Sequence, residues 1–106
     1  MYNGSSEMDY TIYKSEEYEE WYDGETAKSQ VQIEKRLSNV EFHGHFGIHK
    51  SVGECVWELK WRNSRRLYYA YLEEENLLLL LGGNKNGQNE DIKRARRILK
   101  NNTEGS

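Results

Sequence analysis

Five cationic or phenolic side chains are spaced so that a folded chain would carry them on one surface. Lys60 and Arg62 alternate with apolar residues in CVWELKWR, and Arg66 and Tyr68 alternate in the following RRLYYAY. Lys85 comes shortly afterwards, in the polar turn GGNKNGQ. A guanidinium group binds two phosphate oxygens at once, and an ammonium group binds them as a point charge. The set therefore predicts contact with a phosphate-bearing partner, with Arg66 as the best-suited phosphate cation.

Each of these residues also has a purely structural explanation. Arg66 can pair with Glu58 across a hairpin instead of binding phosphate, and Lys85 can be an exposed turn lysine. Lys60 can belong to a solvated strand face. Tyr68 can stack on a base or donate a proton, although a strand tyrosine is more often part of the packing. The sequence leaves these alternatives open.

Three histidines form a second group with chemical potential, at His43, His45 and His49. Their spacing resembles a metal-binding set, but a glycine-containing loop holds ligands poorly, so we expect no metal there. His45 or His49 can instead act as a general acid or base, because unperturbed histidine titrates near neutral pH. The GGNK segment is not a nucleotide-binding loop, since it lacks the full Gly-x-x-x-x-Gly-Lys-Ser/Thr pattern.

Hydrophobic periodicity predicts the elements that must position these side chains. Tyr18, Trp21 and Tyr22 recur at the spacing of a helix that begins at Ser15. By contrast, residues 55–62 alternate apolar and polar side chains with the period of a strand that has one apolar face. The expected elements are a strand at 10–13, helices at 15–24 and 25–40, a loop at 41–50, strands at 55–62, 65–72 and 77–81, and a helix at 87–100.

The densest apolar run is LLLLL, at Leu77–Leu81. It is too short to cross a bilayer, which takes about 20 residues, and it suits a strand buried on both faces. Gly82 and Gly83 are expected to turn the chain out of the sheet. Asn86 is expected to cap the last helix, with Gln88 helping to fix where that helix starts.

The composition limits the class of protein. A chain of 106 residues with 31% charged side chains makes one soluble domain. The single cysteine, Cys55, excludes an internal disulfide and a thiolate zinc site, and it fits a reducing compartment. MYNGSSEM lacks the basic and apolar regions of a signal peptide. We therefore expect a cytoplasmic protein with a flexible lead at 1–8, one domain at 9–100 and a flexible tail at 101–106.

The net charge of −3 conceals an uneven distribution. Residues 1–25 contain eight acidic side chains and one lysine, whereas residues 26–106 contain fourteen Lys and Arg against ten acids. Such asymmetry is a better guide to partners than the total charge. It allows a nucleic-acid partner on the basic part, and it is explained equally well by one acidic and one basic solvated helix.

The order of the elements defines the fold class. One strand, two helices, three strands and a final helix predict an α+β fold. We expect a small antiparallel sheet, an N-terminal helical pair packed on one face and a C-terminal helix. The other face of the sheet is then free to carry Lys60, Arg62, Arg66 and Tyr68, near the turn that contains Lys85.

Three segments in this order resemble successive blocks of the RelE/ParE toxin superfamily, particularly its HigB-like, phage-derived addiction module killer proteins. VGECVWELKW resembles a Gly-x-x-x-x-Glu-Leu-Arg block, and RRLYYAY resembles Tyr-Arg-Val-Tyr-Tyr. The segment LLLLLGGNKNGQNEDI resembles an apolar run followed by Gly-Gly-Asp-Lys-Ser-x-Gln-x-x-Asp-Ile, with Asn84 in the place of the acid. Together with YTIY and the Trp21 helix, the likeness covers roughly residues 8–100.

The resemblance implies the RelE-like order β-α-α-β-β-β-α and the toxic half of a bacterial type II toxin–antitoxin pair. Relatives similar to RelE or HigB cut messenger RNA on the ribosome without a metal or other cofactor, whereas ParE relatives inhibit DNA gyrase. The expected activity is thus a ribosome-dependent endoribonuclease neutralised by a helix-turn-helix antitoxin. The alternative is a gyrase inhibitor or a catalytically degenerate antitoxin-binding protein, because fold alone does not determine chemistry.

Metal-free RNA cleavage needs a base for the 2′-OH proton, cations for the charged phosphorane and an acid for the leaving 5′-oxygen. On this resemblance, Lys85 can stabilise charge or, when deprotonated, act as the base. The catalytic candidates are Arg66, Lys85, Lys60, Tyr68 and His49, and the RNA- or ribosome-binding candidates are Arg62, Arg65, Gln88, Lys93, Arg94 and Arg97. The expected assembly is a monomer or a toxin–antitoxin hetero-oligomer without membrane attachment.

Overall fold

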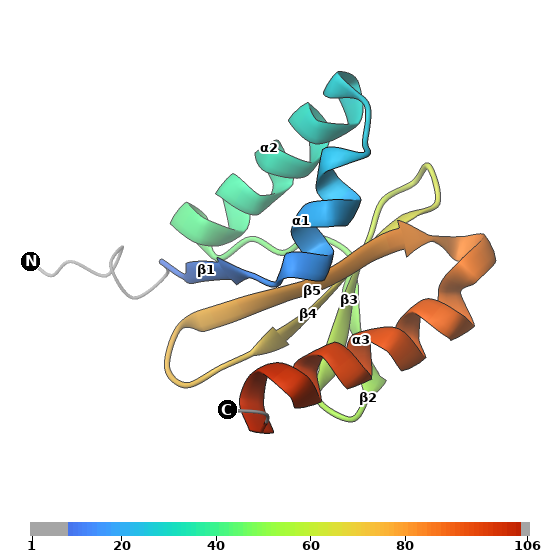
Figure 1. Cartoon of the computed structure of the whole chain (residues 1–106). Coiled ribbons are helices and arrows are strands. Elements are labelled where there is room, and N and C mark those ends of the chain that lie inside the picture. Colours follow the sequence, from blue (N-terminus) through green and yellow to red (C-terminus); the bar gives the residue numbers. More distant parts are fainter. Residues whose placement is uncertain (1–8, 105–106) are drawn as a thin grey trace, which may run out of the picture.

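Helices and strands of residues 9–104 are described by a computed structural model (Figure 1). The predicted α+β class, with an N-terminal helical pair and a C-terminal helix, is confirmed. The predicted flexible tail at 101–106 was wrong for residues 101–104, which belong to the last helix. The predicted lead at 1–8 and residues 105–106 lie outside the described residues. The elements are β1 (Thr11–Lys14), α1 (Glu16–Asp23), α2 (Ala27–His43), β2 (His49–Gly53), β3 (Val56–Lys60), β4 (Arg65–Tyr71), β5 (Asn76–Asn84), the 3₁₀ turn η2 (Lys85–Gly87) and α3 (Gln88–Glu104).

The sheet has five strands in the order β1-β5-β4-β3-β2. Strands β2 to β5 pair antiparallel, but β1 runs parallel to β5, with Ile12 opposite Leu77. The sheet is therefore mixed rather than antiparallel as predicted. Side-chain periodicity reports which face a residue occupies and carries no information on strand direction, so the parallel pair was not visible in the sequence.

The predicted loop at 41–50 contains the end of α2 and the start of an unpredicted strand. Gly44 ends α2 in the left-handed region, at φ 67°, and its N–H donates to the carbonyl of Val40. β2 then forms one edge of the sheet. Its residues are mostly exposed, so they lack the apolar alternation that identifies a half-buried strand. His49 consequently lies on a strand and not on a flexible loop.

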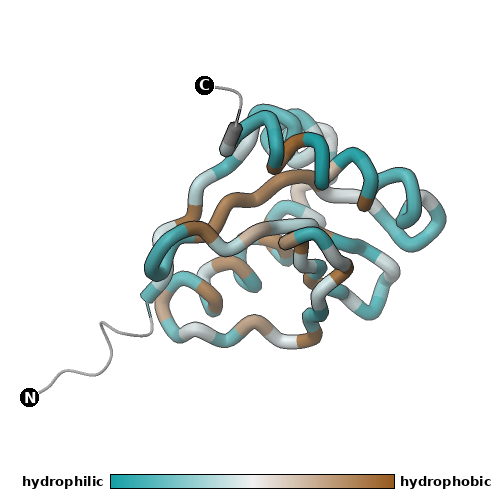
Figure 2. Tube along the Cα trace, turned by 90° about the horizontal axis from the view of Figure 1, so that it is seen from below, coloured by the Kyte–Doolittle hydropathy of each residue, from teal (hydrophilic) through white to brown (hydrophobic). Residues whose placement is uncertain are grey.

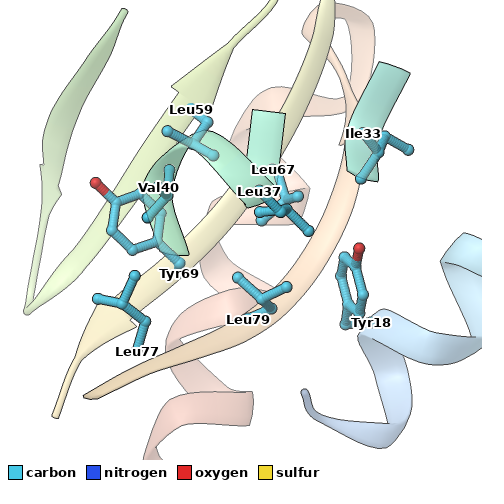
Figure 3. Close-up of a cluster of buried hydrophobic side chains, with 9 residues drawn as sticks. All are labelled: Tyr18, Ile33, Leu37, Val40, Leu59, Leu67, Tyr69, Leu77 and Leu79. Carbon is cyan, nitrogen blue, oxygen red and sulfur yellow. The ribbon is translucent and has the colours of Figure 1, made fainter. Parts of the chain in front are cut away.

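Ser15 and Thr26 begin the two N-terminal helices as side-chain caps. The Ser15 hydroxyl accepts a hydrogen bond from the Tyr18 N–H at 3.0 Å, and the Thr26 hydroxyl accepts one from Ser29 at 3.1 Å. The apolar sides of both helices pack on one face of the sheet, called here the α1/α2 face. Its buried core consists of Tyr18, Ile33, Leu37, Val40, Leu59, Leu67, Tyr69, Leu77 and Leu79 (Figure 3).

α3 covers the opposite face, called here the α3 face, so the sheet lies between two helical layers (Figure 1). Figure 2 shows a hydrophobic central run between more hydrophilic helices. The leucine run contributes to both cores because successive strand residues point to opposite sides, which confirms the predicted strand buried on both faces. The second core consists of Val56, Tyr68, Ala70, Leu78, Leu80, Leu81, Ala95 and Ile98.

Gly82 and Gly83 lie within β5 and do not turn the chain out of the sheet, so that prediction was wrong. A Cβ atom at Gly82 would overlap the indole of Trp21, and one at Gly83 would overlap the carboxylate of Asp91. The two glycines therefore allow α1 to approach the strand from one side and α3 from the other. The chain leaves the sheet one step later, at η2.

Candidate functional site

Arg66 lies near the start of β4, opposite Lys60 of β3 and Gly83 of β5. Only 8% of the residue is exposed. Its Nε lies 3.8 Å from Oε2 of Glu58, and its Nη1 donates a hydrogen bond to the carbonyl of Arg65 at 3.0 Å. The hairpin pairing that the sequence offered as the alternative to phosphate binding is therefore present.

Glu58 is the centre of a polar network beneath the start of α3. Its side chain is fully buried, and besides facing Arg66 its Oε2 accepts a hydrogen bond from Nε2 of Gln88 at 2.6 Å. Oε1 has no hydrogen-bond partner in the part of the chain that the structure describes. A buried carboxylate is costly unless it is paired and hydrogen-bonded. Arg66 and Gln88 thus stabilise Glu58 together, and Gln88 ties the start of α3 to β3.

Tyr68 belongs to the same network but is completely buried in the α3 core. The prediction of an open face that carries Tyr68 was wrong, because the apolar stripe of α3 covers that face. Burial, and then the charges of Glu58 and Asp91, raise the pKa of Tyr68. The phenol therefore stays protonated at neutral pH, and stacking on a base would require α3 to move.

The first turn of α3 places a second carboxylate beside the network. Asp91 is half-buried and fills the space above Gly83. Burial raises the pKa of Asp91, and the neighbouring charge of Arg94 opposes that rise. Asp91 thus packs against Gly83 at the start of the helix and helps to keep the Tyr68 proton in place.

Three predicted cations are exposed or half-buried, and none forms an ion pair with any residue of 9–104: Lys60, Arg62 and Lys85. The backbone N–H of Lys85 donates to the carbonyl of Ser64 at 3.0 Å, which joins η2 to the β3–β4 turn. The structure thereby brings the predicted lysines and Arg66 to the same end of the sheet.

The turn that carries Lys85 is built on Asn84 rather than Asn86. Oδ1 of Asn84 accepts a hydrogen bond from the Asn86 N–H at 2.9 Å, whereas Asn86 was predicted to be the cap. An open hollow of about 340 Å³ lies beside this turn and is lined by residues 85–90. A ligand phosphate in this hollow would meet Lys85 and the amino-terminal end of α3, which favour negative charge, and Glu90, which opposes it.

Two predicted residues are on the opposite side of the sheet from Arg66. Nδ1 of His49 lies 3.0 Å from the hydroxyl of Tyr69, in the α1/α2 core. Nη2 of Arg65 donates to Oε1 of Gln32 at 3.0 Å, and burial lowers the pKa of Arg65. His49 therefore cannot exchange protons directly with a phosphate held by Arg66, and Arg65 serves the attachment of α2.

The basic side chains of α3 have two different roles. Lys93, Arg94 and Arg97 are exposed, as a contact surface for RNA or ribosome requires. Arg96 instead donates from Nη2 to the carbonyl of Val52 at 2.6 Å, which fastens β2 to the helix.

Sequence reasoning overlooked Arg36. Its three guanidinium nitrogens donate to the carbonyls of Phe46, Ile48 and Lys60 at 2.9, 2.8 and 2.7 Å, and the group stacks 4.5 Å from the ring centre of Trp61. No motif marks it, because a helix arginine next to lysine and glutamate has the pattern of a solvated cation. The available signal was its position directly before Leu37, a core residue, which places Arg36 at the edge of the helix side that packs on the sheet.

This end of the α3 face supplies accessible cations, which are the groups that stabilise a charged phosphorane, whereas the buried Tyr68 phenol is not open to a substrate. Among residues 9–104, no three His, Cys, Asp or Glu side chains gather as metal ligands would. No helix in that range is long and apolar enough to span a bilayer.

The fold is similar to that of solved structures of an E. coli toxin. A RelE mutant in the free state superimposes with a TM-score of 0.68 and 19% identity, over 86% of this chain and 99% of RelE. Isolated RelE superimposes with a TM-score of 0.60 and 21% identity, over 80% of this chain and 97% of RelE. A chain of the E. coli RelBE toxin–antitoxin complex superimposes with a TM-score of 0.61 and 20% identity, over 71% of this chain and 95% of that chain. At these identities the likeness defines the fold, and it confirms the RelE-type fold that the sequence predicted.

Sequence comparison gives one further relationship. The chain is 35% identical over 72 residues to an uncharacterized protein of Haemophilus influenzae, a match that spans 65% of this chain and 71% of that protein. The chain therefore belongs to the same family as this Haemophilus protein. No family model matches the sequence, and the HigB-like subgroup remains a prediction.

Proposed function

Since the chain has the fold of the E. coli toxin RelE, we propose that it is the toxin of a bacterial type II toxin–antitoxin pair. The observation that carries the proposal is the match along 99% of the RelE chain. RelE also occurs in a toxin–antitoxin complex, RelBE, which supports an antitoxin as the partner. The protein acts in the cytoplasm, and its antitoxin is of the helix-turn-helix type.

The proposed activity is metal-independent cleavage of messenger RNA on the ribosome. Lys60 and Lys85 stabilise the phosphorane, and Arg66 adds its charge from below the surface. Lys93, Arg94 and Arg97 contact ribosomal or messenger RNA phosphates from the outer side of α3. The acidic residues of α1 support this orientation, because they belong to the layer on the other side of the sheet.

One observation favours the second candidate function, a degenerate toxin that only binds its antitoxin. Arg66 is committed to Glu58 and almost fully buried, so the strongest phosphate ligand of the set is not open to RNA. A ParE-like gyrase inhibitor is compatible with the same geometry, since it needs no phosphate cation.

The test is induced expression in bacteria, with primer extension on a reporter message in the same cells. We compare the natural chain with a Lys60→Ala/Lys85→Ala double variant and, as matched control, Lys28→Ala/Lys35→Ala on exposed positions of α2. Loss of both site lysines should reduce cleavage by at least about 100-fold, since removal of a single charge donor typically costs roughly that much. The control should cut at the natural rate.

The other outcomes separate the candidates. Growth arrest with intact message would replace the nuclease by the gyrase inhibitor. No arrest, combined with tight binding of the protein encoded by the neighbouring gene, would leave the antitoxin-binding function. Cleavage that survives in a folded double variant would remove Lys60 and Lys85 from the site.

A further inference from the structure

A second surface with binding chemistry lies on the α1/α2 face, beyond the end of α2. Its rings form a continuous series: Phe46 stacks on His49 with centroids 5.1 Å apart, and His49 stacks on Trp57 at 5.6 Å. Tyr71 meets Trp57 edge-on at 5.5 Å, and Tyr10 meets Phe46 edge-on at 5.3 Å. We call these five residues the aromatic surface.

The aromatic surface is both accessible and rigid. Tyr71 is 40% exposed, His49 is exposed, and Phe46 and Trp57 are half-buried against the core. Beneath them Tyr69 is buried, and its hydroxyl points away from the other core side chains toward His49 (Figure 3). Because the rings pack against one another, ordering them on ligand binding should cost little conformational entropy.

Acidic residues outnumber basic ones in the segments that carry these rings, and one cation, Arg36, reaches them by donating to the carbonyl of Phe46. Tyr10 follows Asp9, and Tyr71 is followed by Glu73–Glu75 in the β4–β5 turn. The Thr11 N–H donates to the carbonyl of Glu75 at 2.9 Å, which places Glu75 next to Tyr10 in the sheet. Burial, and then the nearby Tyr71 and Glu75, raise the pKa of Tyr10. Segments 9–10, 41–49 and 71–76 contain five acidic residues and no lysine or arginine, and β3, which supplies Trp57, contains one of each sign, Glu58 and Lys60.

An open hollow extends the aromatic surface at the same end of the sheet. It has a volume of about 760 Å³ and is lined by two exposed tyrosines, Tyr13 and Tyr71, together with Glu73. A ring face and a carboxylate on the walls of one hollow are the two groups that attract a guanidinium or ammonium ion.

We propose that the aromatic surface and this hollow bind a basic segment of a partner protein, through arginine or lysine side chains. Ring faces attract cations, and the surrounding carboxylates add Coulomb attraction. The same carboxylates repel a phosphate backbone, so single-stranded RNA, which also stacks on aromatic rings, is the disfavoured occupant. This contact is separate from the RNA site proposed above, because Tyr71 ends β4 whereas Arg66 lies near the start of that strand.

The proposal is tested by NMR titration of the full chain with three probes. These are the peptide acetyl-Gly-Arg-Gly-Arg-Gly-Arg-amide, its citrulline counterpart, which is neutral and of the same shape, and a uridine hexanucleotide. We expect the arginine peptide to shift the indole N–H of Trp57 and the backbone amides of His49 and Tyr71. Its dissociation constant should be at least about fivefold lower than that of the citrulline peptide, as the loss of cation–π contacts requires.

Three variants locate the site. Tyr71→Ala and the double variant Glu73→Gln/Glu75→Gln should each weaken binding of the arginine peptide about two- to fivefold. The matched control, Glu19→Gln/Glu20→Gln on exposed positions of α1, removes the same charge elsewhere and should leave binding unchanged.

The proposal fails under any of four results. These are no shift of the named signals, equal binding of the citrulline peptide, equal weakening by the α1 control, or shifts of the same signals by the hexanucleotide alone. The last result would assign the surface to RNA. None of the four depends on whether the chain cleaves messenger RNA, so the proposed function is judged separately.

Discussion

The helices that cover the two faces of the sheet are attached by different kinds of interaction. On the α1/α2 face, rings and aliphatic side chains form the core, and the one charged residue of the described range that is buried there, Arg65, stacks on Trp61 at the margin. On the α3 face, Glu58 and Arg66 are buried beside an otherwise apolar core. An apolar core gains stability directly from burial, whereas a buried ion pair must first offset the loss of hydration.

The contrast has a consequence for function. The cations that suit RNA lie at the end of the α3 face, where the packing is most dependent on polar partners. The α1/α2 face carries the acidic helix and the aromatic surface, and its two structural cations, Arg36 and Arg65, are held by carbonyl and amide oxygens and not by a buried carboxylate. Disturbing the α3 face is therefore expected to change stability and function together, whereas the aromatic surface can be altered without unfolding the domain.

Arg66→Ala is expected to have the largest effect. It leaves the Glu58 carboxylate buried without its cation, which typically costs about 3–5 kcal/mol of the free energy of unfolding. Urea unfolding followed by far-UV circular dichroism measures the loss. The matched double variant Glu58→Leu/Arg66→Met removes both charges and should recover most of it. A loss below about 1 kcal/mol in the single variant would mean that the pair contributes little.

This expectation also governs how toxicity data are interpreted. Loss of growth arrest in Arg66→Ala alone cannot distinguish a missing phosphate ligand from an unfolded domain. Lys60 and Lys85 form no ion pair within residues 9–104, so their replacement reports on chemistry.

Gly82→Ala tests the close packing of the α1/α2 face. The new methyl group would overlap the Trp21 indole, and forcing α1 outward should cost about 1–3 kcal/mol. Gly24→Ala is the control, since a Cβ there meets its nearest atom at 3.6 Å. Thermal unfolding of both variants measures the difference. Equal stability would show that Trp21 can move away without loss.

Tyr68→Phe and Tyr69→Phe compare the two faces at adjacent residues. The Tyr68 hydroxyl has no hydrogen-bond partner within the described range, so its removal should be neutral or stabilise by up to about 1 kcal/mol. The Tyr69 hydroxyl lies 3.0 Å from His49, so its removal should destabilise by about 1 kcal/mol. Shifts of the urea midpoint in opposite directions for the two variants would confirm the contrast between the faces. Equal losses of stability in both variants would contradict it.

Much of the fold could be predicted because burial imposes a period on the sequence. The period placed β3, β4 and α3 and assigned Arg66 and Tyr68 to the same face correctly. It could not show that α3 covers this face, because an apolar stripe identifies a helix side and not the surface against which it packs. Sequence therefore named Glu58 as a possible partner of Arg66 without showing that both are buried.

Two other errors of the sequence-based prediction also arise from tertiary contacts that the sequence pattern does not contain. Gly82 and Gly83 look like a turn in the sequence, but their small size is needed because Trp21 and Asp91 approach from distant segments. The edge strand β2 has too few buried residues to generate a pattern. Local sequence patterns thus predicted most helices and strands. Tertiary contacts, which those patterns do not contain, determined which side chains of the candidate site are exposed.

Asp91→Asn is expected to have the smallest effect, and its sign depends on pH. Burial raises the folded-state pKa of Asp91 above its ordinary value of 3.8, so the ionised carboxyl is less favourable in the folded chain than in the unfolded one. This cost is present above the folded pKa and is lost as the pH falls toward 3.8. The variant should therefore be slightly more stable than the natural chain at pH 7 and lose that advantage toward pH 3.8, as measured by urea midpoints.

Glu90→Gln, at the exposed preceding position, controls for the loss of a negative charge at the helix start. Destabilisation by Asp91→Asn at pH 7 that exceeds the control would mean that the contact above Gly83 outweighs desolvation, and the α3 face would then depend on a second carboxylate.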